Sequence, residues 1–209
     1  PHECSSAASD VYKRQAVQSA SRALRNKALF FLAYQDGGEL AKLQVQEALN
    51  MTDQLSAFST LIKHNPTSEN INFFYNQWKH ERLVIDKWFS AQVIMAHPNY
   101  LNKVVKDLTN HRDFSLKTPN RIRSVLGAFS ANTAGFHQEN GENYELFSDW
   151  ILKVDPINPQ VAARMCSAFE TWKRYDVNRQ KLIKMQIDKI LEVNTISKDT
   201  KEMLTRLVS

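Results

Sequence analysis

Glycine and cysteine are scarce in this 209-residue sequence, which contains five glycines and two cysteines. Alternating β-branched runs are rare as well, so the composition favours helices over strands. Cys4 and Cys166 lie far apart in the sequence, which argues against a disulfide framework and predicts a reducing, cytoplasmic compartment. No apolar run approaches the roughly 18 residues that a membrane span needs, and no signal peptide is visible.

Motifs for metal binding and catalysis are also missing. His80-Glu81 begins like a His-Glu-x-x-His zinc motif, but Val84 stands where the second histidine belongs. There is no Gly-rich phosphate loop, no nucleophile elbow and no Cys/His cluster with metal-ligand spacing. The sequence therefore predicts no catalytic residue and no metal site within this chain.

Positive charge is in excess, with 27 Lys and Arg against 22 Asp and Glu and a formal net charge of +5. These basic residues are spread along the chain without forming a block, so we interpret them as solvated helix faces and expect no nucleic-acid partner. A nucleic-acid-binding helical array is left as an alternative, which would require strongly salt-dependent binding.

The sequence that is present has helical periodicity from Ala16 to the C-terminus. The first 15 residues do not share this pattern and the chain does not begin with Met, so we expect residues 1–15 to be a non-native leader. Residues 16–209 are expected to form one α-helical domain. We predict an all-α fold, an irregular superhelical array of about ten antiparallel helices like an armadillo or HEAT solenoid.

The helix boundaries follow from capping residues and breakers. Asp36-Gly37-Gly38 ends the first helix, and residues 132–143, with two glycines, are expected to form a long exposed loop. Among the expected core residues are Leu24, Ala28, Phe31, Leu32, Leu40, Leu43, Ala48, Leu55, Phe58, Ser59, Ile62, Leu83, Ile85, Trp88, Phe89 and Val93. One helix is predicted from Ala16 to the Asp36-Gly37-Gly38 break, one after Thr52, and one after the Asn65-Pro66-Thr67 break that carries Phe73, Phe74 and Trp78. The other predicted helices span residues 39–49, 81–96, 100–110, 118–131, 144–154, 159–172, 177–192 and 198–208.

Three arginines stand out beside apolar helix faces. Arg121 and Arg123 lie near the start of a helix that opens with Pro119, where a cation opposes the macrodipole at a cost of about 0.3–1 kcal/mol. Arg164 lies at the border of the apolar stripe in the helix that Asn158 caps and Pro159 opens. These positions suit a bound partner. In the alternative, each arginine covers apolar surface with its stem or pairs with a local carboxylate.

Several segments, in the same order, resemble the C-terminal helical domain of bacterial M1-family zinc metallopeptidases of the aminopeptidase N type. The resemblance runs from about residue 20 to the C-terminus. It rests on Phe73-Phe-Tyr-Asn-Gln-Trp78, Leu83-Val-Ile-Asp-Lys-Trp-Phe89, Pro119-Asn-Arg-Ile-Arg123, Gly127-Ala-Phe129, Asn158-Pro-Gln-Val-Ala-Ala-Arg164 and Lys173-Arg-Tyr-Asp176.

The resemblance implies a parent enzyme, monomeric and zinc-dependent, that removes N-terminal residues from peptides. Its zinc and catalytic motifs would lie in an upstream domain of the same polypeptide, and this chain would hold neither. The helical domain would close over the active-site chamber. Arg123 and Arg164 match arginines expected to bind the peptide backbone or its C-terminal carboxylate, with Arg121 as a weaker candidate.

The same resemblance implies that helices preceding this chain are missing, which would leave an apolar face exposed near Leu24–Leu32. The main alternative to the enzyme domain is a stand-alone α-solenoid that binds a peptide or protein on its concave face.

Overall fold

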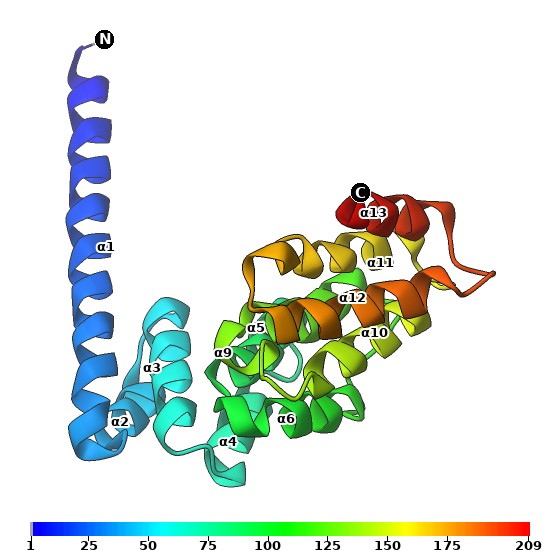
Figure 1. Ribbon diagram of the computed structural model, residues 1–209. Helices are drawn as coiled ribbons and strands as arrows, with labels where there is room; N and C mark the ends of the chain where they lie inside the picture. The colour runs from blue at the N-terminus through cyan, green and yellow to red at the C-terminus, as the bar shows by residue number, and fades with distance from the viewer. Residues whose placement is uncertain (1) are drawn as a thin grey trace. The chain divides into compact units, whose positions relative to one another are not determined.

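The computed structural model describes the backbone of residues 2–209 and the side chains from Gln15 onward. Every regular element in this part of the chain is a helix, which confirms the predicted all-α class (Figure 1). The chain divides into two compact units, residues 1–80 (unit 1) and residues 81–209 (unit 2). None of the described helices is long and apolar enough to cross a membrane.

Unit 1 contains four helices: α1 (His2–Asp36), α2 (Glu39–Glu47), α3 (Met51–His64) and α4 (Ser68–Trp78). The predicted break after Asp36 is confirmed, because Gly37 and Gly38 both have positive φ and the Asp36 carboxylate accepts hydrogen bonds from Gly38 N and Leu40 N. The predicted leader lies in the first half of α1. The side chains of residues 1–14 are outside the described part, and the origin of this stretch stays a prediction.

The core prediction for α1 and α2 is wrong in its choice of face. Leu40 and Leu43 are half exposed, whereas Ala41 and Val45 are buried against α1 and α3. The predicted core residues Leu24, Phe31 and Leu32 are also exposed, and it is Leu29 and Ala33 that are buried. The burial of small residues follows from the close approach of three helices.

Unit 2 contains α5 (Arg82–Met95), α6 (Leu101–Thr109) and α7 (Pro119–Ile122), followed by a π-helical turn (Arg123–Gly127) and α8 (Ala128–Ala131). The predicted helix over 118–131 is thus continuous but contains one π turn. The remaining α-helices are α9 (Thr133–Phe136), α10 (Glu142–Val154), α11 (Pro159–Cys166), α12 (Val177–Leu191) and α13 (Lys198–Val208), with 3-10 turns at Pro98–Tyr100, Ser167–Phe169 and Trp172–Arg174.

An aromatic cluster forms the centre of unit 2. The ring of Phe136 lies 5.3 Å from that of Phe129, 5.5 Å from Tyr144 and 5.1 Å from Phe147, measured between centroids. Each of these side chains is buried. Ile85, Trp88, Phe89 and Val93 of α5 are buried as predicted, but the predicted core residue Leu83 is exposed.

The prediction of an exposed loop over residues 132–143 is wrong. Asn132, Gly135, Phe136 and Asn143 are buried, and residues 133–136 form α9. The Asn132 amide donates to Val93 O at 2.9 Å and Ala96 O at 3.1 Å, and its Oδ1 accepts from Gly135 N. Asn143 donates to Gly135 O at 2.7 Å. The polar residues that suggested a loop instead satisfy buried backbone groups.

Candidate functional site

The helix that opens at Pro119 directs its two arginines to different sides. Residues i and i+2 of a helix lie about 200° apart around the axis, so Arg121 and Arg123 cannot share a face. Arg121 is 7% exposed, whereas Arg123 is exposed to solvent. One side therefore packs into unit 2 and the other faces outward.

Arg121 packs against α5. Its Nε atom lies 2.8 Å from Asp86 Oδ1, and its guanidinium carbon lies 4.6 Å from the centre of the Phe89 ring. This is the alternative in which an arginine pairs with a local carboxylate, and the cation–π contact adds to it. The structure does not bring Arg121 together with the other two predicted arginines, so the geometry gives no support to a substrate-binding role for it.

Arg123 begins the π-helical turn. The N–H of Ala128 bonds to the carbonyl of Arg123, five residues earlier, and this pattern defines the turn. Single π turns inside α-helices occur frequently at functional sites. Nothing in the residues 118–131 marked this turn, since their apolar spacing fits an ordinary helix.

Arg123 and Arg164 line the same cleft, which has a volume of about 500 Å³. Residues from the π turn, α8, α10 and α11 form its walls. The apolar part of the lining is Ile122, Phe147, Val161, Met165 and Ala168, and the polar part is Arg123, Ser130, Gln160, Arg164 and Ser167. The structure thus brings together two predicted residues that are distant in the sequence.

The lining of the cleft carries positive charge, because Arg123 and Arg164 belong to it and no acidic residue does. Within the described chain, neither Arg123 nor Arg164 forms an ion pair with a carboxylate, and Arg123 donates only to the amide oxygen of Asn120. Guanidinium groups above an apolar floor can hold a carboxylate by charge-assisted hydrogen bonds while the floor contacts carbon atoms.

The start of α11 is built as the sequence predicts. Asn158 Oδ1 accepts from Val161 N at 3.2 Å, and Pro159 occupies the first turn. This cap fixes Gln160 and Val161 at one end of the cleft lining, with Arg164 one turn further on.

Four further lining residues were not predicted from the sequence: Ser130, Phe147, Gln160 and Ser167. Ser130 follows Arg123 by seven residues, so helical spacing was a signal that could have identified it. Phe147 gave no such signal, because the approach of α10 to α11 depends on tertiary packing.

Groups suited to covalent or metal chemistry are absent from this cleft. Cys166 lies behind it on α11, fully buried, and burial raises the pKa of its thiol to about 12, with the nearby Asp155 carboxylate acting in the same direction. The thiol therefore stays protonated and is a poor nucleophile. The described side chains include no group of three His, Cys, Asp or Glu residues that could hold a metal ion.

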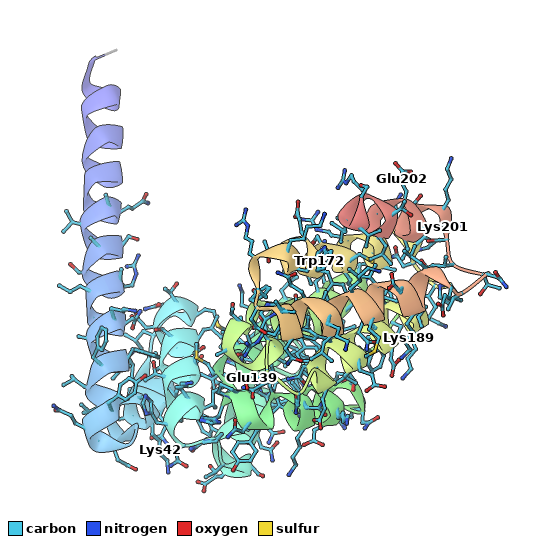
Figure 2. All side chains as sticks on the ribbon, viewed as in Figure 1. Lys42, Glu139, Trp172, Lys189, Lys201 and Glu202 are labelled. Atoms are coloured by element: carbon cyan, nitrogen blue, oxygen red, sulfur yellow. The ribbon has the colours of Figure 1, made fainter. Side chains whose placement is uncertain are left out.

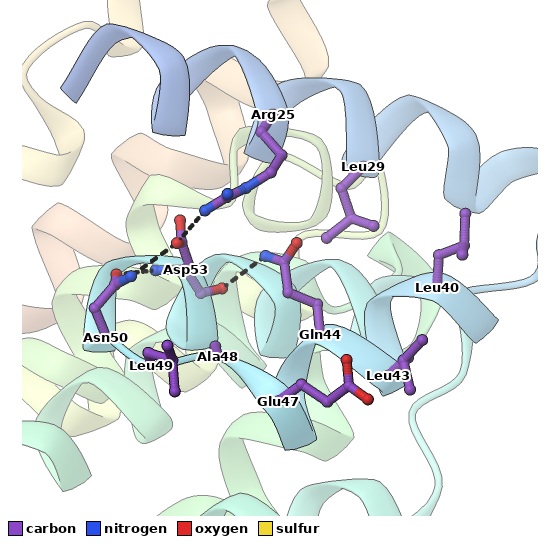
Figure 3. A pocket seen from close by; sticks show the side chains of 10 residues that line it. All are labelled: Arg25, Leu29, Leu40, Leu43, Gln44, Glu47, Ala48, Leu49, Asn50 and Asp53. Carbon is purple, nitrogen blue, oxygen red and sulfur yellow. Dashed lines mark hydrogen bonds and ion pairs between the residues drawn. The ribbon is translucent and has the colours of Figure 1, made fainter. Parts of the chain in front are cut away.

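Unit 1 has a second cleft, also of about 500 Å³, between α1, α2 and the start of α3 (Figure 3). Its apolar lining includes Leu40, Leu43 and Leu49, and the last of these is completely exposed. At its edge, Asp53 accepts hydrogen bonds from Asn26, Asn50 and Arg25. Burial alone would raise the pKa of Asp53, but the bonds from Asn50 and Asn26 and the charge of Arg25 outweigh burial and lower it.

A family model covers residues 2–209 and is described as a domain of unknown function, DUF3458_C, with ARM repeats. The chain belongs to this family. It corresponds to the C-terminal ARM-repeat domain of the M1-family aminopeptidases N, which confirms the resemblance found in the sequence and the armadillo-like class of the fold.

Individual relatives agree with this assignment. Aminopeptidase N of Haemophilus influenzae is 34% identical over 90% of this chain, and that of Escherichia coli is 34% identical over 95%. The crystal structure of Legionella pneumophila aminopeptidase A in complex with aspartic acid matches 91% of the chain with a TM-score of 0.85 and 33% identity. The chain spans only 22–23% of the length of these relatives.

Proposed function

We propose that this chain is the C-terminal domain of a zinc-dependent aminopeptidase N, where it caps the active-site chamber and helps to bind peptide substrates. The relatives that carry this domain are aminopeptidases and are about four times longer. The zinc and the catalytic residues would belong to an upstream domain of the same polypeptide, since the described residues of this chain contain no metal-ligand set. A monomeric, cytoplasmic parent enzyme is part of the same proposal.

The observation that carries the proposal is the shared cleft of Arg123 and Arg164. We assign these two side chains to the C-terminal carboxylate or the backbone of the peptide. Each is exposed and without an acidic partner in the described chain, so neither has to break an ion pair before it binds a carboxylate. Gln160 adds an amide donor to the lining, whereas the hydroxyls of Ser130 and Ser167 donate to Gly127 O and Arg164 O and can only accept from a peptide N–H.

The test compares two substrates in the full enzyme that carries this domain. Arg123→Ala and Arg164→Ala should raise KM for a peptide with a free carboxylate by about ten-fold or more, the usual worth of a charged hydrogen bond. Hydrolysis of a short amino-acid amide reporter, which has no carboxylate to bind, should change little. Arg174→Ala is the matched control, because Arg174 is exposed and lies outside the cleft. Equal, small effects on both substrates would contradict the proposal.

A stand-alone peptide-binding module is the second candidate. One observation favours it: all residues that line the cleft come from unit 2, so the carboxylate site needs no residue from outside this chain. Titration of the 209-residue chain with a fluorescent peptide, as the free acid and as the amide, measures this directly. Binding that depends on the free acid shows that the cleft acts without the rest of the enzyme.

A further inference from the structure

His137 lies between two tyrosines that come from different parts of unit 2. Its Nδ1 atom is 2.9 Å from the hydroxyl of Tyr144, and its Nε2 atom is 2.8 Å from the hydroxyl of Tyr175. The His137 and Tyr175 rings also stack, with centroids 4.1 Å apart. Both imidazole nitrogens are therefore engaged, and the three side chains join the turn before α10 to the residue that precedes the α12 cap.

The backbone reinforces this connection. Arg179 of α12 donates from Nε to His137 O at 2.7 Å, and Asn178 donates to Glu139 O at 3.2 Å. At Gly141, where φ is +72°, an added Cβ would meet the Leu182 side chain at 3.0 Å, so the turn lies directly against α12. The segment 137–141 is thus fastened to α12 by several hydrogen bonds and by close packing.

This arrangement of hydrogen bonds requires a neutral histidine. A neutral imidazole has one donor and one acceptor, so one tyrosine donates to it and the other accepts from it. A protonated imidazole has two donors, so both hydroxyls would have to accept and would need other acceptors for their own hydrogens. Tyr144 is completely buried, so water cannot supply one for its hydroxyl.

The burial of His137 and the nearby Arg179 charge also act against protonation of its imidazole. Burial is the main cause that lowers the pKa of His137, and the Arg179 guanidinium lowers it further. That guanidinium is in turn paired with Asp176 at 2.5 Å and Glu139 at 3.4 Å, which offset part of its charge. Burial raises the pKa of Tyr144 to about 12, so this tyrosine stays neutral over the whole working range.

We propose that Tyr144, His137 and Tyr175 form a pH-sensitive latch, closed while His137 is neutral, whose protonation releases the 137–141 segment from α12. Two aromatic rings connect the latch to the cleft lined by Arg123 and Arg164. Phe136 precedes His137 and packs against Phe147, with ring centroids 5.1 Å apart, and Phe147 lines the cleft. The consequence for peptide binding, weaker binding in acid, rests on the function proposed above; the latch itself does not.

The sign of the effect follows from linkage. Because the pKa of His137 is lower in the folded chain than in the unfolded chain, the unfolded chain binds the proton first as the pH falls below about 6.5. The same holds for any open form of the latch in which the imidazole meets water. The closed latch is therefore favoured at pH 7.5, and the free-energy difference that favours it over the open form becomes smaller as the pH falls toward 5.

Hydrogen exchange resolved by peptide fragments tests the latch in the 209-residue chain. After correction for the intrinsic rate, exchange in the fragments that cover residues 137–141 should speed up by about three-fold or more between pH 7.5 and pH 5.5, relative to α11 and α13. In Tyr175→Phe, which removes one bond but keeps the ring, this segment should exchange faster at pH 7.5 and depend less on pH. His97→Gln, at an exposed histidine of the same unit, is the control and should behave like the unmodified chain.

A titration of the His137 ring by NMR in the unmodified chain provides a second measurement that needs no variant. Protonation at an ordinary pKa with unchanged protection of residues 137–141 would overturn the latch. So would equal pH dependence in the unmodified chain and in Tyr175→Phe. If the latch opens but binding of the free-acid peptide stays constant between pH 7.5 and 5.5, the latch stands and its link to the cleft fails. If amidated and free-acid peptides bind equally at pH 7.5, the carboxylate site itself is wrong.

Discussion

In unit 1, large apolar side chains of α1 and α2 face solvent, whereas in unit 2 an aromatic cluster is fully buried. Leu24, Phe31 and Leu49 are among the most exposed apolar residues of unit 1; the first two lie in α1 and Leu49 lies in the turn that follows α2. Unit 2 also exposes Leu83, Ile157 and Val177, but singly and far apart in the sequence. Single exposed apolar residues are normal on a protein surface, and a concentration of them is not.

The difference shows what an amphipathic helix needs besides its own sequence. In ARM-type repeats each helix buries its apolar face only against a neighbour, and an end without a neighbour exposes it. Unit 2 supplies neighbours for α5, α8, α10 and α11 from within itself. Unit 1 covers one side of α1 and α2, and polar contacts centred on Asp53 join α1 to α3.

The largest effect is expected in the aromatic cluster of unit 2. Phe136→Ala removes a ring that touches Phe129, Tyr144 and Phe147, and should lower the free energy of unfolding of unit 2 by about 3–5 kcal/mol. Urea titration read by peptide-resolved hydrogen exchange reports the two units separately. Phe31→Ala in unit 1, where the ring is mostly exposed, is the matched control and should cost less than about 1 kcal/mol. Similar losses for both would contradict the contrast between the units.

A smaller effect is expected at the polar centre of unit 1. Asp53→Asn keeps the shape of the side chain but replaces the carboxylate that accepts hydrogen bonds from Asn26, Asn50 and Arg25. It should lower the free energy of unfolding of unit 1 by about 1.5–3 kcal/mol. Glu47→Gln, at an exposed carboxylate of the same cleft, should cost almost nothing.

The pH dependence of unit 1 follows from the same carboxylate. The pKa of Asp53 is lowered in the folded chain. The Asp53 carboxylate therefore stabilises the fold above about pH 4, and this stabilisation is lost as the pH falls through the folded pKa. Unit 1 should therefore lose this contribution only in strong acid, and Asp53→Asn should flatten that loss. The latch of unit 2, by contrast, responds between pH 7.5 and 5. A loss of stability of unit 1 already at pH 6 would contradict this assignment.

Local sequence signals predicted most of the helices and the buried face of α5, but not the buried faces of α1 and α2. The caps at Asn158 and the Gly37-Gly38 break depend on neighbouring residues alone and were predictable. The burial of Ala41 in place of Leu40 depends on how closely α1 and α3 approach, which no residue of α2 encodes.

The segment 132–143 shows the same limit more sharply. Gly135 resembles a loop residue in the sequence, yet an added Cβ there would lie 2.5 Å from Leu101 Cδ2. A side chain at position 135 would collide with Leu101 of α6, so the packing requires glycine there. Asn132 satisfies the backbone carbonyls at the end of α5. Long-range packing also separates the arginines: Arg121 pairs with Asp86 of α5, whereas Arg123 lines the cleft.

The smallest effect on stability, and the most direct test of the exposed face, is expected at Leu43. Leu43 lines the unit 1 cleft and is half exposed, so Leu43→Ser should change the free energy of unfolding by less than about 0.5 kcal/mol. It should nevertheless reduce the binding of a dye such as ANS and any self-association measured by analytical ultracentrifugation, because both depend on contiguous exposed apolar surface. Met185→Ser, at an exposed apolar residue of unit 2, is the control and should leave both readings unchanged. If Leu43→Ser unfolds unit 1 instead, the side chain belongs to the core and the contrast between the two units disappears at this position.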